Sequence, residues 1–177
     1  MLTPRERNYV KAIECRLNRM RSFLLDRQLP GHDDPSSWYS YLAALKAIQG
    51  NPSNDVSFVA TMMAKRYLED GYQVTGFDAA AKPQGAPGID IDVQLPDGRR
   101  LVAEIKTTSP YKPDDLGAQQ KAMLQKDLAK LKEAKADVKL FLLTERRTFD
   151  LMKKPKYRLQ LGGVQVVLLP LGEVIAA

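Results

Sequence analysis

The sequence predicts an α/β fold, in which a mixed central β-sheet is flanked by helices and preceded by an N-terminal helical extension. Apolar residues recur every three or four positions through the first fifty residues, which is typical of helices. From residue 54 onward, helical patterns alternate with short strand-like segments, which predicts a sheet with helices on its faces. The 177 residues, 44% of them hydrophobic, suit one globular domain with a small extension.

Residues 1–53 are predicted to form the extension, as two helices. Thr3 to Glu6 reads as a capping box, with a proline at the first helical position. A second helix is expected to begin after Asp34, and the Gly/Asn/Pro-rich segment 50–54 predicts a break. Residues 54–177 are then predicted to form the core.

The predicted elements of the core follow one another in the order α-β-β-β-α-β-α-β. They are a helix over 55–70, strands over 72–75, 89–95 and 99–107, a helix over 116–135, a strand over 138–144, a short helix over 145–153 and a strand over 164–169. The segment 78–88 contains two prolines and two glycines and is expected to be a loop. Many unrelated proteins share such an order, so it indicates no function by itself.

The composition excludes several kinds of site. Cys15 and His32 are the only cysteine and histidine, so an intrachain disulfide and a Cys/His zinc site are excluded. No apolar run approaches the ~20 residues of a membrane span, and the N-terminus lacks the apolar segment of a signal peptide, so we expect a cytoplasmic protein. The net charge of +6 favours a polyanionic partner such as nucleic acid.

A predicted β-hairpin carries the candidate catalytic and metal-binding residues. Residues 96–98, Pro-Asp-Gly, suit a type I turn followed by a left-handed glycine, which pairs Leu95 with Arg99. Counting back along both strands, this register places Asp90 opposite Glu104. A two-residue turn would shift the register by one and separate the acids, but it would also break the apolar pattern.

Side chains of the hairpin alternate between an apolar and a charged face. The apolar face, expected on the core side, receives Ile89, Ile91, Val93, Leu95, Leu101, Ala103 and Ile105. The other face receives Asp90, Asp92, Gln94, Val102, Glu104 and Lys106. Directly opposed like charges destabilise a hairpin, which weighs against the alternative of a solvated salt-bridge patch.

Carboxylates that converge in this way predict a divalent cation between them. Mg²⁺ prefers a few carboxylate oxygens plus waters, and leaves positions open for a phosphate oxygen and an attacking water. A lysine on the same face can orient or deprotonate that water, or stabilise charge on the phosphate. Asp90, Glu104 and Lys106 are therefore the candidate catalytic residues of a phosphodiester hydrolase.

With these residues the chain resembles the PD-(D/E)XK nuclease superfamily, the restriction-endonuclease-like fold. The resemblance rests on Asp90 after Gly88-Ile89, on Glu104-Ile105-Lys106, and on the surrounding order of elements over about residues 54–170. The family implies a Mg²⁺-dependent cut of DNA, with Mn²⁺ as a possible substitute. It implies that Asp90, Glu104 and the Ile105 backbone carbonyl bind the metal and that Lys106 is the catalytic lysine.

Other roles stay open on the sequence alone. Asp92 lies on the same face as Asp90 and is the alternative metal ligand; one or two metal ions are possible. The resemblance places the helix 116–135 along the substrate side, so the predicted substrate-binding residues are Thr107, Thr108, Gln120 and Lys121. The alternative for Thr107 and Thr108 is a purely structural role in the loop that leads into the helix.

The sequence therefore predicts an endodeoxyribonuclease, most like a restriction enzyme. A structure-specific junction or repair nuclease and a catalytically silent DNA- or protein-binding module on the same fold are the alternatives. Cutting both strands of a duplex suggests a homodimer. The N-terminal helices are expected to pack on the core, mediate dimerisation or contact DNA.

Overall fold

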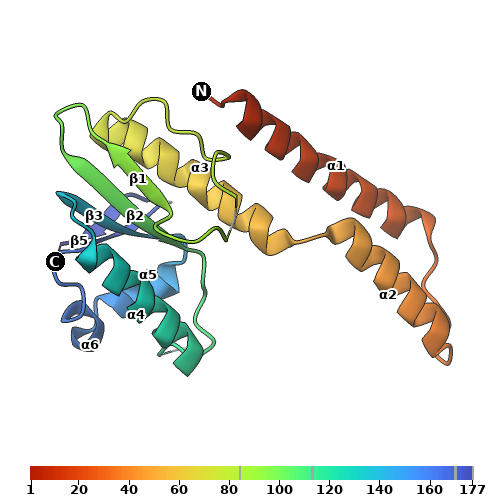
Figure 1. Ribbon diagram of the computed structural model, residues 1–177. Coiled ribbons are helices and arrows are strands. Elements are labelled where there is room, and N and C mark those ends of the chain that lie inside the picture. Colours follow the sequence, from red (N-terminus) through yellow and green to blue (C-terminus); the bar gives the residue numbers. More distant parts are fainter. Residues whose placement is uncertain (84, 113, 170, 177) are drawn as a thin grey trace. The chain divides into compact units, whose positions relative to one another are not determined.

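The computed structural model describes residues 1–83, 85–112, 114–169 and 171–176. The chain divides into two compact units, Met1–Asp55 and Val56–Ala177. The division falls within two residues of the boundary predicted between 53 and 54. Figure 1 shows helices alone in the first unit and a sheet with helices in the second.

The first unit contains the two predicted helices, α1 (Pro4–Asp26) and α2 (Pro35–Gln49). Thr3 caps α1 through the expected capping box, because its side chain accepts from the Glu6 amide and the Glu6 carboxylate accepts from the Thr3 amide. Asp34 caps α2 in a similar way. The rings of Phe23 and Tyr41, 4.8 Å apart, join the two helices.

The second unit is built on a five-stranded mixed sheet of order β1-β2-β3-β4-β5. The strands are β1 (Ile91–Gln94), β2 (Arg100–Lys106), β3 (Val138–Leu143), β4 (Gln165–Leu168) and β5 (Glu173–Ile175). The three central strands are parallel to one another, and β1 and β5 pair antiparallel at the edges. The predicted α/β class with a mixed sheet is therefore confirmed.

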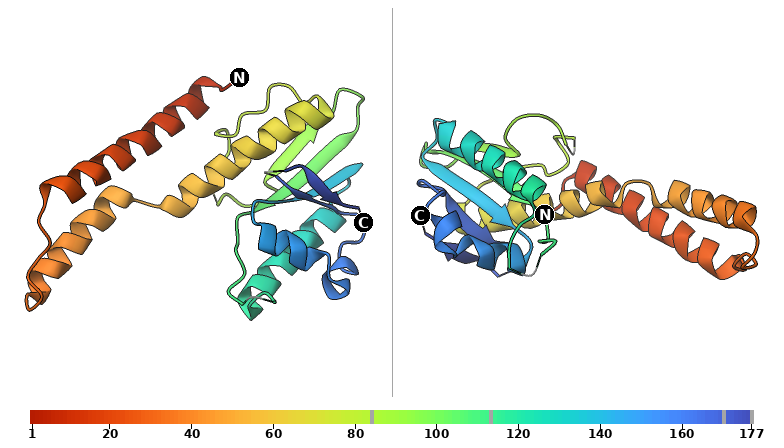
Figure 2. Two further views of the ribbon diagram at one scale, coloured as in Figure 1. Left: turned by 180° about the vertical axis from the view of Figure 1, so that it is seen from behind. Right: turned by 90° about the horizontal axis from the view of Figure 1, so that it is seen from below.

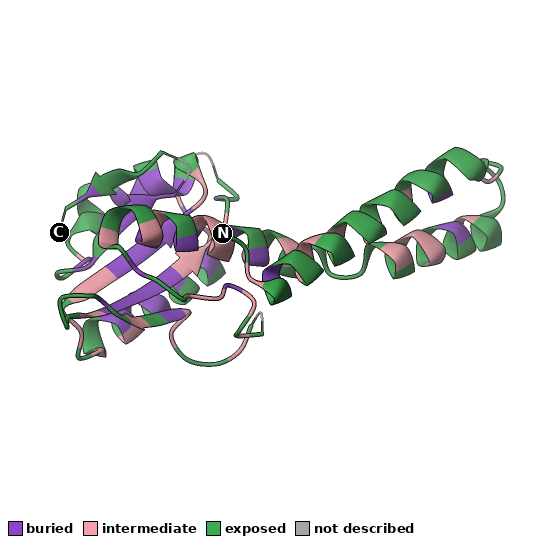
Figure 3. Cartoon of the chain, turned by 90° about the horizontal axis from the view of Figure 1, so that it is seen from above, coloured by how far each residue is buried: buried purple, intermediate pink, exposed green. Residues whose placement is uncertain are grey.

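Helices cover both faces of this sheet (Figure 2). α3 (Pro52–Tyr72) packs on one face, where Ala64 and Leu68 contact the apolar residues of the hairpin. α4 (Ala118–Glu133), α5 (Arg146–Met152) and the short α6 (Pro155–Arg158) cover the opposite face. Figure 3 shows the buried residues along the strands and on the inward sides of these helices. Within the described part of the chain, no helix has the length and apolarity needed to cross a membrane.

The register predicted for the hairpin is confirmed over its four paired positions, which end one residue short of Asp90 and Glu104. Asp92 pairs with Val102 and Ile91 with Ala103. The Leu95 amide donates to the Arg99 carbonyl at 2.8 Å, which closes the turn. Gly98 adopts a φ of 87°, the left-handed conformation that the turn requires and that glycine accepts without strain.

The predicted strand over 72–75 is wrong, and so is the element order that contained it. α3 continues to Tyr72, and the chain then reverses at Gln73, whose φ is 54°. The Val74 amide donates to the Leu68 carbonyl at 3.2 Å and so satisfies the end of the helix. Within the described residues the order from α3 is α-β-β-α-β-α-α-β-β, since α6 and β5 were not predicted.

Candidate active site

The hairpin places Asp90, Glu104 and Lys106 on the face of the sheet that α4 covers. Val102, which lies on that face, is fully buried in the cluster formed with α4. Asp90 immediately precedes β1, and its Oδ2 accepts from the Ile105 amide at 2.9 Å. This bond fixes the carboxylate at the point where the two strands diverge. The charged face is therefore enclosed by a helix, whereas the sequence pattern alone left a solvated patch as an alternative.

Glu104 is a buried carboxylate, with only 2% of its surface exposed. Burial, together with the negative charges of Asp90 and Asp127, raises the pKa of Glu104 to about 7, against the lowering effect of Lys130. The Lys130 Nζ lies 3.2 Å from Glu104 Oε1. The site thus concentrates negative charge and partly compensates it with a lysine.

Two residues of α4 complete a chain of alternating charges. Lys130 Nζ lies 3.2 Å from Asp127 Oδ1, and Lys106 Nζ lies 2.5 Å from Asp127 Oδ2. The Lys106 contact is an ion pair without hydrogen-bond alignment, because Asp127 Oδ2 has no hydrogen-bond partner within the described residues. The order in space is Glu104, Lys130, Asp127, Lys106.

Asp127 and Lys130 were not predicted as site residues, although the sequence contains a signal for Asp127. Asp127 stands three residues after Leu124 and four before Leu131, on the stripe of α4 that faces the sheet. An acidic residue on a buried stripe indicates a partner in the core or a function. That the Asp127 carboxylate is buried becomes clear only once the helix is placed against β2.

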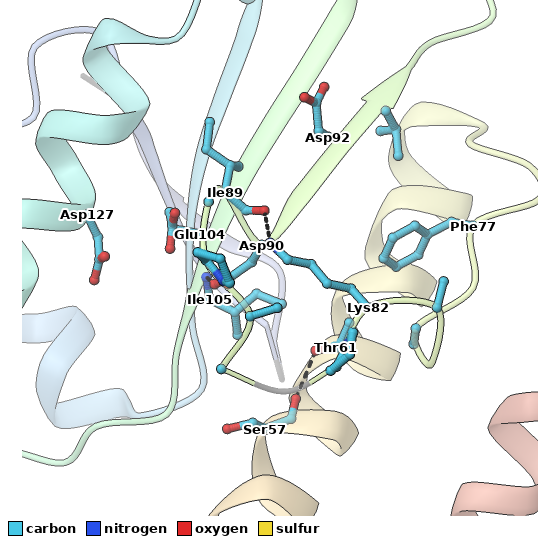
Figure 4. Close-up of a pocket in the computed structure, with 18 of the residues that line it drawn as sticks. Ser57, Thr61, Phe77, Lys82, Ile89, Asp90, Asp92, Glu104, Ile105 and Asp127 are labelled. Carbon is cyan, nitrogen blue, oxygen red and sulfur yellow. Dashed lines mark hydrogen bonds between the residues drawn. The ribbon is translucent and has the colours of Figure 1, made fainter.

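These residues line a cavity of about 1120 Å³. Its walls also include Ser57 and Thr61 of α3 and Phe77 and Lys82 of the loop before β1. Figure 4 shows Glu104 between Asp127 and Asp90, with Phe77 and Lys82 on the far wall. Lys82 Nζ donates to the Ile89 carbonyl at 2.6 Å and so ties the loop to the segment that carries Asp90.

Asp92, the alternative metal ligand, lines the same cavity but is bound to another residue. Its two carboxylate oxygens accept from the guanidinium of Arg100 at 2.9 and 2.6 Å. Hydrogen bonding to Arg100 lowers the pKa of Asp92. Since 47% of its side chain is exposed, Asp92 belongs to a surface ion pair, in contrast to the enclosed Glu104.

The structure brings only some of the predicted substrate-binding residues to the cavity. Thr107 lines it directly. Thr108 lies at a small adjoining pocket next to Lys106, and its carbonyl accepts from the Thr148 hydroxyl at 2.5 Å. The Thr108 backbone therefore serves to connect β2 to α5.

Gln120 and Lys121 are engaged in holding the loop before α4. Gln120 Nε2 donates to the Ser109 carbonyl at 2.8 Å, and its Oε1 accepts from the Gly117 amide at 3.0 Å. Lys121 Nζ lies 2.6 Å from Asp115 Oδ2, and Lys121 is not part of the cavity wall formed by the described residues. A structural role accounts for both side chains.

The donor set of the site fits one divalent cation with mixed protein and water ligands. Among the described residues, no group of three or more His, Cys, Asp or Glu side chains is arranged to hold a metal. Asp90 and Glu104 supply two carboxylates, and Ile105 lines the same cavity. Mg²⁺ is commonly bound by one or two carboxylates with several waters retained, which matches this set. Burial and the neighbouring charge of Asp90 raise the pKa of Glu104, and a bound cation would stabilise the charged form of this carboxylate.

The raised pKa of Glu104 predicts a pH dependence of stability. Above the ordinary value of 4.5 the unfolded chain releases this proton first, so the unfolding free energy of the metal-free protein should fall as pH rises to about 7. Below pH 4.5 and above pH 7, Glu104 causes no further change of the unfolding free energy with pH. Denaturant unfolding in EDTA across this range, for wild type and Glu104→Gln, checks the expectation. Parallel curves for the two proteins would contradict it.

The candidate active site is defined by opposed carboxylates, by a lysine two residues after Glu104 and by the cavity into which they open. Every residue of this set belongs to the second unit. No protein-family model, curated protein sequence or solved structure matches the chain.

Proposed function

We propose that this protein is a Mg²⁺-dependent endodeoxyribonuclease with a restriction-endonuclease-like core of the PD-(D/E)XK type. The observation that carries the proposal is the position of Asp90, Glu104 and Lys106 on one enclosed face of the hairpin, at a cavity of about 1120 Å³. Asp, Glu and Lys form the set that metal-assisted phosphodiester hydrolysis needs without histidine or cysteine.

Each residue has a distinct role in the proposed site. Asp90, Glu104 and the Ile105 carbonyl would hold Mg²⁺, or Mn²⁺ in its place. A bound ion would polarise the scissile phosphate and lower the pKa of a bound water. The Lys106 ammonium stabilises negative charge on the phosphate and helps to orient the attacking water. The enclosure by α4 strengthens these interactions by excluding bulk water.

DNA is the proposed substrate because the chain has a net positive charge and lysines stand among the carboxylates that line the cavity. The chain has a net charge of +6, and Lys82, Lys126 and Lys130 line the cavity beside Lys106. Lysines at such positions neutralise backbone phosphates and make binding salt-dependent. We further propose a cytoplasmic homodimer, since one site per chain cuts one strand.

A catalytically silent binding module is the second candidate, and one contact favours it. The Lys130 ammonium already neutralises part of the Glu104 charge, at 3.2 Å. A lysine in that position can replace a metal ion structurally. The module would bind DNA in a salt-dependent manner without cutting it.

A panel of DNA substrates tests the proposal and separates its alternatives. Linear duplex, a four-way junction and single-stranded DNA are each incubated with Mg²⁺, with Mn²⁺ and with EDTA. We expect metal-dependent cutting of linear duplex into discrete fragments. Cutting confined to the junction would instead identify a structure-specific nuclease. Binding without cleavage of any substrate would identify the silent module.

A further inference from the structure

Asp127 of α4 is the residue that connects the helix to the candidate catalytic lysine. Its Oδ2 lies 2.5 Å from Lys106 Nζ, and its Oδ1 lies 3.2 Å from Lys130 Nζ. Only 5% of the Asp127 surface is exposed. The carboxylate therefore sits between two ammonium groups, inside the helix–sheet interface.

Packing alone does not require a carboxylate at this position. The neighbouring inward positions of α4 are Leu124, Leu128 and Leu131, which fill the interface with apolar side chains. Replacing a buried ion pair with apolar residues is often neutral or stabilising, because desolvating the charges costs as much as their attraction returns. A buried Asp127 in this stripe thus indicates a role other than stability.

Lysine is a flexible side chain, and its direction must be fixed for it to act on a phosphate. Lys106 is the last residue of β2, and its side chain remains 21% exposed at the cavity. An ammonium at this position would sample several rotamers without a partner. The contact with Asp127 restricts those rotamers and holds the charge at the edge of the cavity.

We propose that Asp127 is a positioning residue of the reaction, which acts by holding the Lys106 ammonium in its productive direction. This inference rests on the proposed nuclease function and extends it to a residue outside the Asp90, Glu104 and Lys106 set. Lys130 holds Glu104 in a parallel way, at the other end of the same chain of charges.

Asp127→Asn tests the inference, because it keeps the shape of the side chain and removes its charge. Under metal-dependent cleavage of duplex DNA, kcat should fall about 10- to 100-fold while KM stays unchanged. Asp127→Glu, which restores the carboxylate, should recover a large part of the lost kcat. Asp70→Asn is the matched control, since it removes an exposed carboxylate of α3 that lies away from the cavity.

A double-mutant cycle with Lys106→Ala separates positioning from a structural effect. If Asp127 acts through Lys106, Asp127→Asn should cost less than about twofold in the Lys106→Ala background, measured with excess enzyme on supercoiled plasmid. Full additivity of the two losses, or wild-type kcat in Asp127→Asn, would overturn the inference and leave the nuclease intact. Absence of cleavage by wild type would instead overturn the proposed function, and the inference with it, before any variant is compared.

Discussion

Glu104→Gln is expected to lower the rate of DNA cleavage by about a thousandfold or more. Glutamine keeps the shape of the side chain and an acceptor for Lys130, but it loses the negative charge that we assign to metal binding. Because the buried charge of Glu104 is costly, this variant should fold at least as well as wild type. Lys106→Ala should lower the rate about 100- to 1000-fold by removing the ammonium from the phosphate.

Single-turnover cleavage and circular dichroism, applied to the same preparations, check both expectations. Glu133→Gln and Lys135→Ala are the matched controls, because both residues are exposed and neither lines the cavity. The controls should cut at the wild-type rate. If folded Glu104→Gln also cut at that rate, the assignment of the active site to this hairpin would be wrong.

Asp90→Asn is expected to reduce cleavage at least about 100-fold, whereas Asp92→Asn should change it by less than about threefold. Asp90 lines the same cavity as Glu104, and asparagine can still accept from the Ile105 amide. Asp92 is held by Arg100 at the surface, so its loss removes only an exposed ion pair.

A titration of cleavage rate against Mg²⁺ concentration distinguishes the two acids further. Asp90→Asn should need more Mg²⁺ for half-maximal rate, and Asp92→Asn should match wild type. The reverse order, with Asp92→Asn the more damaged protein, would make Asp92 the metal ligand and would require Arg100 to release it.

The hairpin could be predicted because its register depends on local sequence. The Pro96-Asp97-Gly98 turn and the alternation of apolar residues both lead to the same pairing, which the Leu95–Arg99 bond realises. The prediction of a strand over residues 72–75 was wrong for an equally local reason. Gly71 resembles a helix C-cap, but α3 continues through it, and Gln73 takes the left-handed conformation instead. Val74 is buried as a strand residue would be, although its amide closes the helix.

The network on α4 could not be derived in the same way, because it depends on tertiary contacts. Lys130 was not predicted as a site residue, yet it contacts Glu104 on β2, 26 residues earlier in the chain. The spacing of Gln120 and Lys121 likewise gave no sign of their bonds to the preceding loop. Helix periodicity predicts which side faces inward, whereas partners across an interface depend on how helix and sheet are placed.

Cleavage of phage-length linear duplex DNA, with Mg²⁺ and with EDTA, tests the central claim most directly. Wild type and Glu104→Gln are purified identically, so that any contaminating nuclease appears in both. The proposed function predicts discrete, Mg²⁺-dependent fragments from wild type and intact DNA from Glu104→Gln. Intact DNA from both, under conditions in which wild type binds the duplex, would contradict the claim and favour the silent binding module.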